Sequence, residues 1–352
     1  MDRREFVYGI SASALTLSLP TLKKLVPADR MGVVVHSYAK RYYRDNNSTK
    51  YPAFKDAIGL IKHCHQIGAG GVQVGIRGWT DDFTGQVRDL RENLDMYLEG
   101  SISLPQSKQD IPEFEKQIKQ AKEAGASVVR TVCLSGRRYE TFDTLEDFKT
   151  FRTNSIRSLE WAEPVIRKNK IKLAVENHKD WRVPELTAIM QHLDSEWMGV
   201  TIDFGNSISL MEDPITTVKG LAPYIFTTHV KDMGVKEYED GFLLSEVPLG
   251  NGVCDLKEMV KVCRAHNPEV RFNLEMITRD PLKVPCLSDK YWATFENLSG
   301  LVLAETLKMV RAKTYEGALP TVSQLSEEKH LAVEEDNVVK SLEYSLNELE
   351  LK

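Results

Sequence analysis

The sequence has 352 residues, enough for one large α/β barrel or for two ordinary domains. Hydrophobic residues make up 42% of the chain and charged residues 28%, which is typical of an ordinary globular protein. The formal net charge of −5 argues against nucleic acid as a partner and favours a small molecule.

The first 28 residues differ from the rest. Arg3 and Arg4 precede a charge-free, moderately apolar run at 7–20, and small residues stand just before Asp29. This arrangement resembles a twin-arginine export signal, and the apolar run is too short and too polar to span a membrane. We expect an exported, periplasmic protein with no stable membrane insertion after signal removal. If the arginine pair is accidental, the segment is an amphipathic helix of a cytoplasmic protein.

From residue 31 onward, short apolar runs alternate with segments of helical periodicity. The runs are rich in Val, Ile, Phe and Thr and are too short for helices, so they indicate buried parallel strands. Eight such alternations predict one closed (β/α)₈ TIM barrel over 29–313, with a doubly wound open sheet as the alternative. No glycine-rich phosphate turn follows the first run, which disfavours a dinucleotide-binding sheet. The runs are 31–38, 71–76, 98–104, 127–134, 171–177, 198–204, 224–230 and 270–276.

The remainder, 314–352, is polar and acidic but carries one apolar stripe. The stripe predicts a C-terminal helical extension that packs on the outside of the barrel or on a partner chain. Its positions are Val338, Leu342, Leu346 and Leu349.

Four apolar runs end in a polar side chain: Glu176 in LAVENH, Asp203 in VTIDFGN, His229 in FTTHVKD and Glu275 in FNLEM. Consecutive barrel strands bring their carboxyl ends together, so these side chains are expected to converge. One such carboxylate is usually a loop cap, but clustered carboxylates repel one another unless a cation compensates them. The set therefore predicts one divalent metal ion, with Mn²⁺, Mg²⁺ or Co²⁺ favoured and Zn²⁺ compatible.

The motifs ENH, DFGN, H-x-K-D, LGNGVCDL and NLE, taken in order, resemble the xylose-isomerase-like barrel superfamily over residues 31–312. This sugar phosphate isomerase/epimerase group includes ketose 3-epimerases, hydroxypyruvate isomerases, and inosose and dehydroshikimate dehydratases. The resemblance implies a metal held by Glu176, Asp203, His229 and Glu275, with the two glutamates as the acid–base pair. Ketose epimerases of the group usually have a histidine where this chain has Asn206, which still offers a substrate hydrogen bond.

The resemblance implies a metal-dependent isomerase or epimerase that acts through an enediolate on an unphosphorylated keto-sugar. A lyase or dehydratase of the same fold, eliminating water or a glycosyl group from a keto-sugar or keto-inositol, is the first alternative. A non-catalytic carbohydrate-binding barrel is the second. Eight histidines and a negative net charge disfavour an AP-endonuclease-like nuclease. The oligomeric state stays open, and such barrels commonly pair.

Several residues near the predicted strand ends are expected to line a substrate pocket with an aromatic wall. His36 and Tyr38 end the first run, Glu99 stands in the third, and Trp181 follows the fifth. His178 offers a substrate-facing imidazole or a structural one.

Two cations follow the last strands. Lys231 is expected to hold substrate oxygens or only to pair with Asp232. Arg279 is expected to bind a carboxylate or phosphate, or to brace a loop through a salt bridge.

Overall fold

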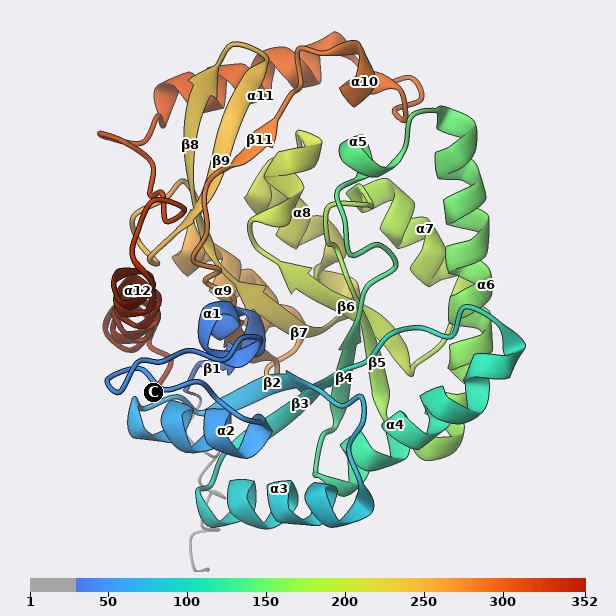
Figure 1. Ribbon diagram of the computed structural model, residues 1–352. Helices are drawn as coiled ribbons and strands as arrows, with labels where there is room; N and C mark the ends of the chain where they lie inside the picture. The colour runs from blue at the N-terminus through green and yellow to red at the C-terminus, as the bar shows by residue number, and fades with distance from the viewer. Residues whose placement is uncertain (1–29) are drawn as a thin grey trace, which may run out of the picture.

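The computed structural model describes residues 30–352, so the predicted export signal at 1–28 lies outside the described part of the chain. All eight strands that the sequence predicts are present, and they close into one parallel barrel (Figure 1). Neighbouring strands follow the order β1-β10-β7-β6-β5-β4-β3-β2, which confirms the predicted TIM barrel. The strands are β1 (Gly32–Val34), β2 (Gly71–Gly75), β3 (Tyr97–Ser101), β4 (Val128–Thr131), β5 (Lys172–Glu176), β6 (Met198–Asp203), β7 (Ile225–Val230) and β10 (Arg271–Leu274).

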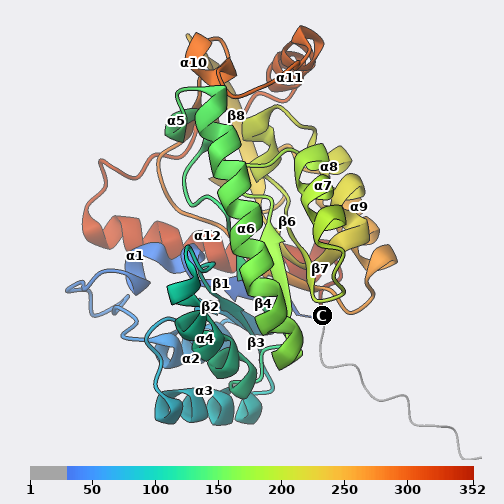
Figure 2. The same ribbon diagram turned by 90° about the vertical axis from the view of Figure 1, so that its right-hand side faces the viewer.

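Helices surround the barrel and begin at residues that cap their free backbone N–H groups. At five helices the capping side chain accepts a hydrogen bond from the backbone N–H three residues further along the chain. The capping residues are Asp56, Thr80, Thr144, Asp213 and Asp255. The 25-residue α6 (Leu145–Asn169) crosses the front of the molecule in Figure 2. The helices around the barrel are α1 (Ala39–Tyr42), α2 (Ala57–Gln66), α3 (Asp81–Asn93), α4 (Ile111–Glu123), α5 (Arg138–Thr141), α6 (Leu145–Asn169), α7 (Val183–Leu193), α8 (Pro214–Leu221) and α9 (Leu256–His266).

A small antiparallel sheet, which the sequence patterns did not predict, extends the barrel after β7. It consists of β8 (Asp232–Tyr238), β9 (Gly241–Val247) and β11 (Leu282–Val284), and stands at the top of Figure 1. Its buried Val235, Phe242 and Leu244 form a second hydrophobic cluster with Val310. That residue belongs to α11 (Gly300–Ala312), so α11 packs on the small sheet; the short α10 (Asp289–Trp292) precedes it.

The predicted C-terminal helix is present as α12 (Glu327–Glu348). It lies beside β10, α1 and the 3-10 turn that follows β1 (η1, Val35–Tyr38). Val338 and Leu342 face the barrel, whereas Leu346 is 43% exposed, so the predicted apolar stripe is wrong at that position. Polar contacts hold the helix as well, because Glu335 pairs with Arg41 and with His63 of α2.

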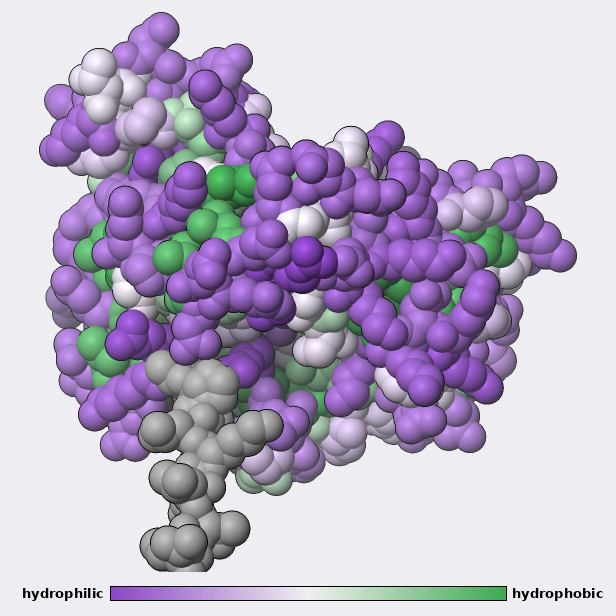
Figure 3. Space-filling view, turned by 90° about the horizontal axis from the view of Figure 1, so that it is seen from below, coloured by the Kyte–Doolittle hydropathy of each residue, from purple (hydrophilic) through white to green (hydrophobic). Residues whose placement is uncertain are grey.

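The surface seen from below Figure 1 is mostly hydrophilic, with hydrophobic side chains scattered in small spots (Figure 3). No helix within residues 30–352 has the length and apolar character that crossing a bilayer requires.

Candidate metal centre

The four side chains predicted as metal ligands converge at the carboxyl ends of their strands. One donor atom from each of Glu176, Asp203, His229 and Glu275 lies within 4.8 Å of the others, and all four residues are buried. Strand pairing explains the arrangement: Asp203 of β6 lies opposite His229 of β7, and the backbone N–H of Glu275 donates to Val230 O at the end of β7.

A chain of hydrogen bonds beneath the cluster orients the imidazole of His229. Gln73 Nε2 donates to Glu99 Oε2, so the amide oxygen of Gln73 faces His229 Nε2 at 2.7 Å. Thr227 and Asn273 also donate to the Glu99 carboxylate. A hydrogen on Nε2 leaves Nδ1 pointing into the cluster, as in histidines that bind metals through a fixed tautomer.

Nδ1 of His229 is buried and makes no hydrogen bond. It lies 3.4 Å from Glu176 Oε2, 3.5 Å from Glu275 Oε2 and 3.9 Å from Asp203 Oδ2. Donor atoms that share an octahedral ion at about 2.1 Å are separated by about 3.0 to 4.2 Å. These separations, together with an imidazole facing three carboxylates, fit a divalent cation.

Neighbouring cationic side chains compensate the carboxylates of the cluster. Lys231 Nζ lies 2.5 Å from Glu275 Oε2 and 2.7 Å from Asp203 Oδ2, and Arg130 pairs with Glu176. Burial would lower the pKa of His229, but the carboxylates of Glu275 and Glu176 outweigh burial and raise this pKa to about 9. With these neighbours His229 is an imidazolium at neutral pH, and it would release its proton if a metal bound.

Three other predicted residues contact the cluster. His36 Nδ1 lies 2.9 Å from Glu275 Oε1, and its side chain is 32% exposed. Asn206 Nδ2 donates to Glu176 Oε1 at 3.0 Å. Lys231, the third, pairs with the cluster carboxylates. Asp232 instead accepts backbone N–H groups from the 250–254 turn, so the alternative of a Lys231–Asp232 pair is wrong.

The remaining predicted residues lie at different distances from the cluster. Glu99 lies beneath it and acts on His229 through Gln73. His178 is partly buried, and burial together with Lys179 holds its pKa well below the usual range. Arg279 pairs with Glu246 of β9, which matches the bracing alternative.

The two aromatic side chains that were expected to line the pocket pack against helices instead. Tyr38 follows β1 in a 3-10 turn (η1, Val35–Tyr38), and its hydroxyl lies 3.1 Å from His63 of α2. Trp181 is 2% exposed and stacks on Phe151 of α6, with ring centroids 5.0 Å apart. Both rings serve packing between the barrel and its helices.

The sequence patterns missed three residues that act on the site. Arg130 and Gln73 stand inside otherwise apolar strand runs, and this placement was an available signal, because a polar residue there must point into the barrel. Lys179 follows Glu176 by three residues and had no comparable signal.

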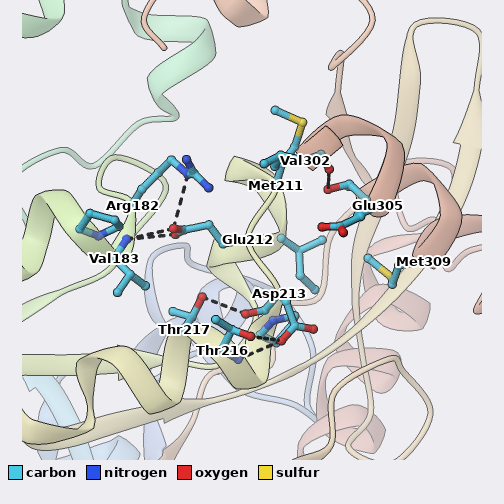
Figure 4. Close-up of a pocket in the computed structure, with 14 residues that line it drawn as sticks. Arg182, Val183, Met211, Glu212, Asp213, Thr216, Thr217, Val302, Glu305 and Met309 are labelled. Atoms are coloured by element: carbon cyan, nitrogen blue, oxygen red, sulfur yellow. Dashed lines mark hydrogen bonds and ion pairs between the residues drawn. The ribbon is translucent and has the colours of Figure 1, made fainter. Parts of the chain in front are cut away.

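A separate cavity of about 550 Å³ lies between α7, α8 and α11 (Figure 4). Glu212 points across it toward Arg182 and accepts the backbone N–H of Val183 at 3.1 Å. None of the four cluster residues lines this cavity.

The chain belongs to the xylose isomerase-like TIM barrel family, whose model matches residues 61–292. An uncharacterized Escherichia coli K12 protein, YihM, is 29% identical over 142 residues, which cover 40% of this chain and 39% of YihM. The 3-oxo-isoapionate decarboxylase of Pectobacterium atrosepticum is 24% identical over 109 residues, 30% of this chain and 40% of that enzyme. The matched stretch thus spans about two fifths of each relative.

Solved structures share the fold at low identity. A xylose isomerase-like TIM barrel protein from Mycobacterium smegmatis, in complex with magnesium, is 17% identical with a TM-score of 0.54. The alignment covers 79% of this chain and 97% of that protein. The D-psicose 3-epimerase of Clostridium cellulolyticum is 11% identical with a TM-score of 0.55, over 81% of this chain and 99% of the epimerase.

Proposed function

We propose that the protein is a metal-dependent isomerase or epimerase that moves a proton next to the carbonyl of an unphosphorylated keto-sugar. The observation that carries the proposal is the placement of Glu176 and Glu275 around one cation-binding cluster. β5 and β10, from which they extend, are separated in the barrel by β6 and β7. Both carboxylates approach His229 Nδ1, at 3.4 and 3.5 Å. Two glutamates on opposite sides of a substrate can remove and return its proton.

Glu176, Asp203, His229 and Glu275 would hold the metal ion. When bound, a divalent cation polarises a substrate carbonyl and makes the neighbouring C–H group more acidic. His36 joins Glu275 Oε1 to the partly exposed side of the site, so it can carry a proton between that carboxylate and solvent. Asn206 and Arg130 hold the two oxygens of Glu176.

A lyase is the second candidate, and the match to a decarboxylase supports it. The same proton transfer can be followed by loss of a leaving group, so both reactions use the same residues. A carbohydrate-binding barrel without activity is the third.

The test is proton exchange in D₂O with the metal-loaded chain and a panel of keto-sugars, followed by NMR. Deuterium at the carbon next to the carbonyl without net elimination supports an isomerase or epimerase. Release of water or of a glycosyl group supports the lyase. Binding without exchange or elimination supports the binding protein and contradicts the proposal.

The matched variants are Glu275→Gln at the site and Glu160→Gln on the surface. Within residues 30–352, the one ion pair of Glu160 is with His192. Loss of the acid–base group is expected to lower exchange by roughly a hundredfold or more. The surface variant should exchange at the wild-type rate.

A further inference from the structure

Lys179 is a buried cation whose hydrogen-bond partner is a neutral amide. Its side chain is 3% exposed, and Nζ donates to Asn206 Oδ1 at 2.5 Å. No ion pair is found for it within residues 30–352. A buried ammonium without a carboxylate partner is unfavourable, so such a group in an enzyme site points to a charge that the ligand supplies.

Two further cations act on Lys179. Lys231 Nζ lies 3.5 Å from Asn206 Oδ1, so the two ammonium groups converge on one oxygen atom. Burial, followed by the charges of Lys231 and Arg279, lowers the pKa of Lys179 to about 8. At neutral pH the side chain is therefore still mostly charged.

The charges of the neighbouring cations are already matched. Lys231 pairs with Asp203 and Glu275, and Arg279 pairs with the buried Glu246. The carboxylates of Glu246 and Asp203 act on Lys179 without an ion pair to it, so Lys179 is the one cation of this trio that lacks an ion pair. A carboxylate, with one negative charge and two acceptor oxygens, matches it better than a doubly charged phosphate does.

Asn206 places this cationic group beside the metal centre. Its Oδ1 accepts from Lys179, while its Nδ2 donates to Glu176 Oε1. A small molecule whose carbonyl end lies at the metal centre can therefore reach Lys179 with a second group.

We propose that Lys179, with Lys231 beside it, binds the carboxylate of the substrate, so that the substrate is a polyhydroxy keto acid. This inference rests on the proposed function, which places the substrate carbonyl at the metal centre. It replaces the neutral keto-sugar of that proposal by a keto acid.

Calorimetric titration of the magnesium-loaded full chain tests the inference without requiring turnover. The probes are 2-keto-D-gluconate and 5-keto-D-gluconate, compared with neutral D-fructose and with D-fructose 6-phosphate. We expect at least one keto acid to bind ten times or more tightly than D-fructose. In Lys179→Met this preference should fall to within about twofold, whereas Lys179→Arg should recover part of it. Lys168→Met, at an exposed site on α6, should keep the full preference.

Magnesium titration of Lys179→Met should give the wild-type affinity, which shows that the metal centre is intact. The inference is overturned if neither keto acid binds more tightly than D-fructose. This includes the case in which no probe binds. A preference that Lys179→Met leaves unchanged overturns it as well. Tightest binding of the phosphate ester, lost in Lys179→Met, overturns the carboxylate assignment. Keto-acid binding without deuterium exchange would instead contradict the isomerase and leave the carboxylate site in place.

Discussion

Nζ of Lys231 lies 2.5 Å from Oε2 of Glu275, an atom that is also placed to bind a metal ion. The same ammonium lies 2.7 Å from Asp203 Oδ2. Lys231 therefore acts as a built-in counter-ion for two of the three clustered carboxylates. This relationship explains how the barrel accommodates these buried acids.

Replacing Lys231 by Met should affect stability and metal affinity in opposite directions. Without metal, the variant should lose about 3–5 kcal/mol of unfolding free energy, because buried carboxylates lose their cationic partner. Its affinity for Mn²⁺ should rise on the order of tenfold, because no ammonium competes for the same oxygens. Urea unfolding and Mn²⁺ calorimetry measure the two effects, with the half-exposed Lys149→Met as control. An unchanged Mn²⁺ affinity would show that the ammonium does not compete with the metal.

Gln73→Leu should weaken metal binding although Gln73 is not among the four predicted metal ligands. Its amide oxygen accepts from His229 Nε2 at 2.7 Å and keeps Nδ1 free for the cation. Loss of such a supporting hydrogen bond typically costs about ten- to a hundredfold in metal affinity. Mn²⁺ titration detects the change, and Gln86→Leu, exposed on α3, is the matched control. Equal affinities for Gln73→Leu and wild type would contradict this role.

Metal affinity should depend on pH through His229. The pKa of its imidazole is raised to about 9 in the ion-free protein, so below that pH the metal must displace a proton. Affinity should therefore rise about tenfold per pH unit and level off above about pH 9. Metal titrations between pH 6.5 and 9.5 test this, and a flat profile would contradict it.

The same pKa shift predicts the pH dependence of stability without metal. The folded-state pKa lies above the unfolded value of about 6.5. The contribution of His229 is thus fully present below about pH 6.5 and is lost as pH rises through 9, and it amounts to about 3 kcal/mol. The unfolding free energies of wild type and His229→Gln should therefore differ less at pH 9.5 than at pH 6. A difference that stays constant with pH would count against the imidazolium.

Asp232 should matter for stability because it organises the turn that follows the small sheet. Its carboxylate accepts the backbone N–H groups of Met233, Gly250, Gly252 and Cys254. Asp232→Ala leaves these donors without a partner and should cost about 3 kcal/mol of unfolding free energy. The exposed Asp240→Ala, at the β8–β9 turn, should change it by less than about 0.5 kcal/mol in the same urea titration. Similar losses in both variants would contradict the role of Asp232.

The sequence by itself determined the barrel and the four clustered side chains. Buried parallel strands appear as short apolar runs, so their number and order could be read directly. The carboxyl ends of such strands share one face, and for this reason Glu176 and Glu275, 99 positions apart in the printed sequence, could be expected to meet.

Tertiary structure decided what surrounds the cluster. Whether Tyr38 or Trp181 faces the site depends on where a strand ends and which way the following turn sends the side chain, and both rings pack against helices. The pairing of Lys231 with Glu275 in place of Asp232, and the isolation of Lys179, arise from contacts between distant segments. Residue types and their spacing carry the period of a strand or helix, but the direction of a loop side chain and its charge partner are set by packing in three dimensions.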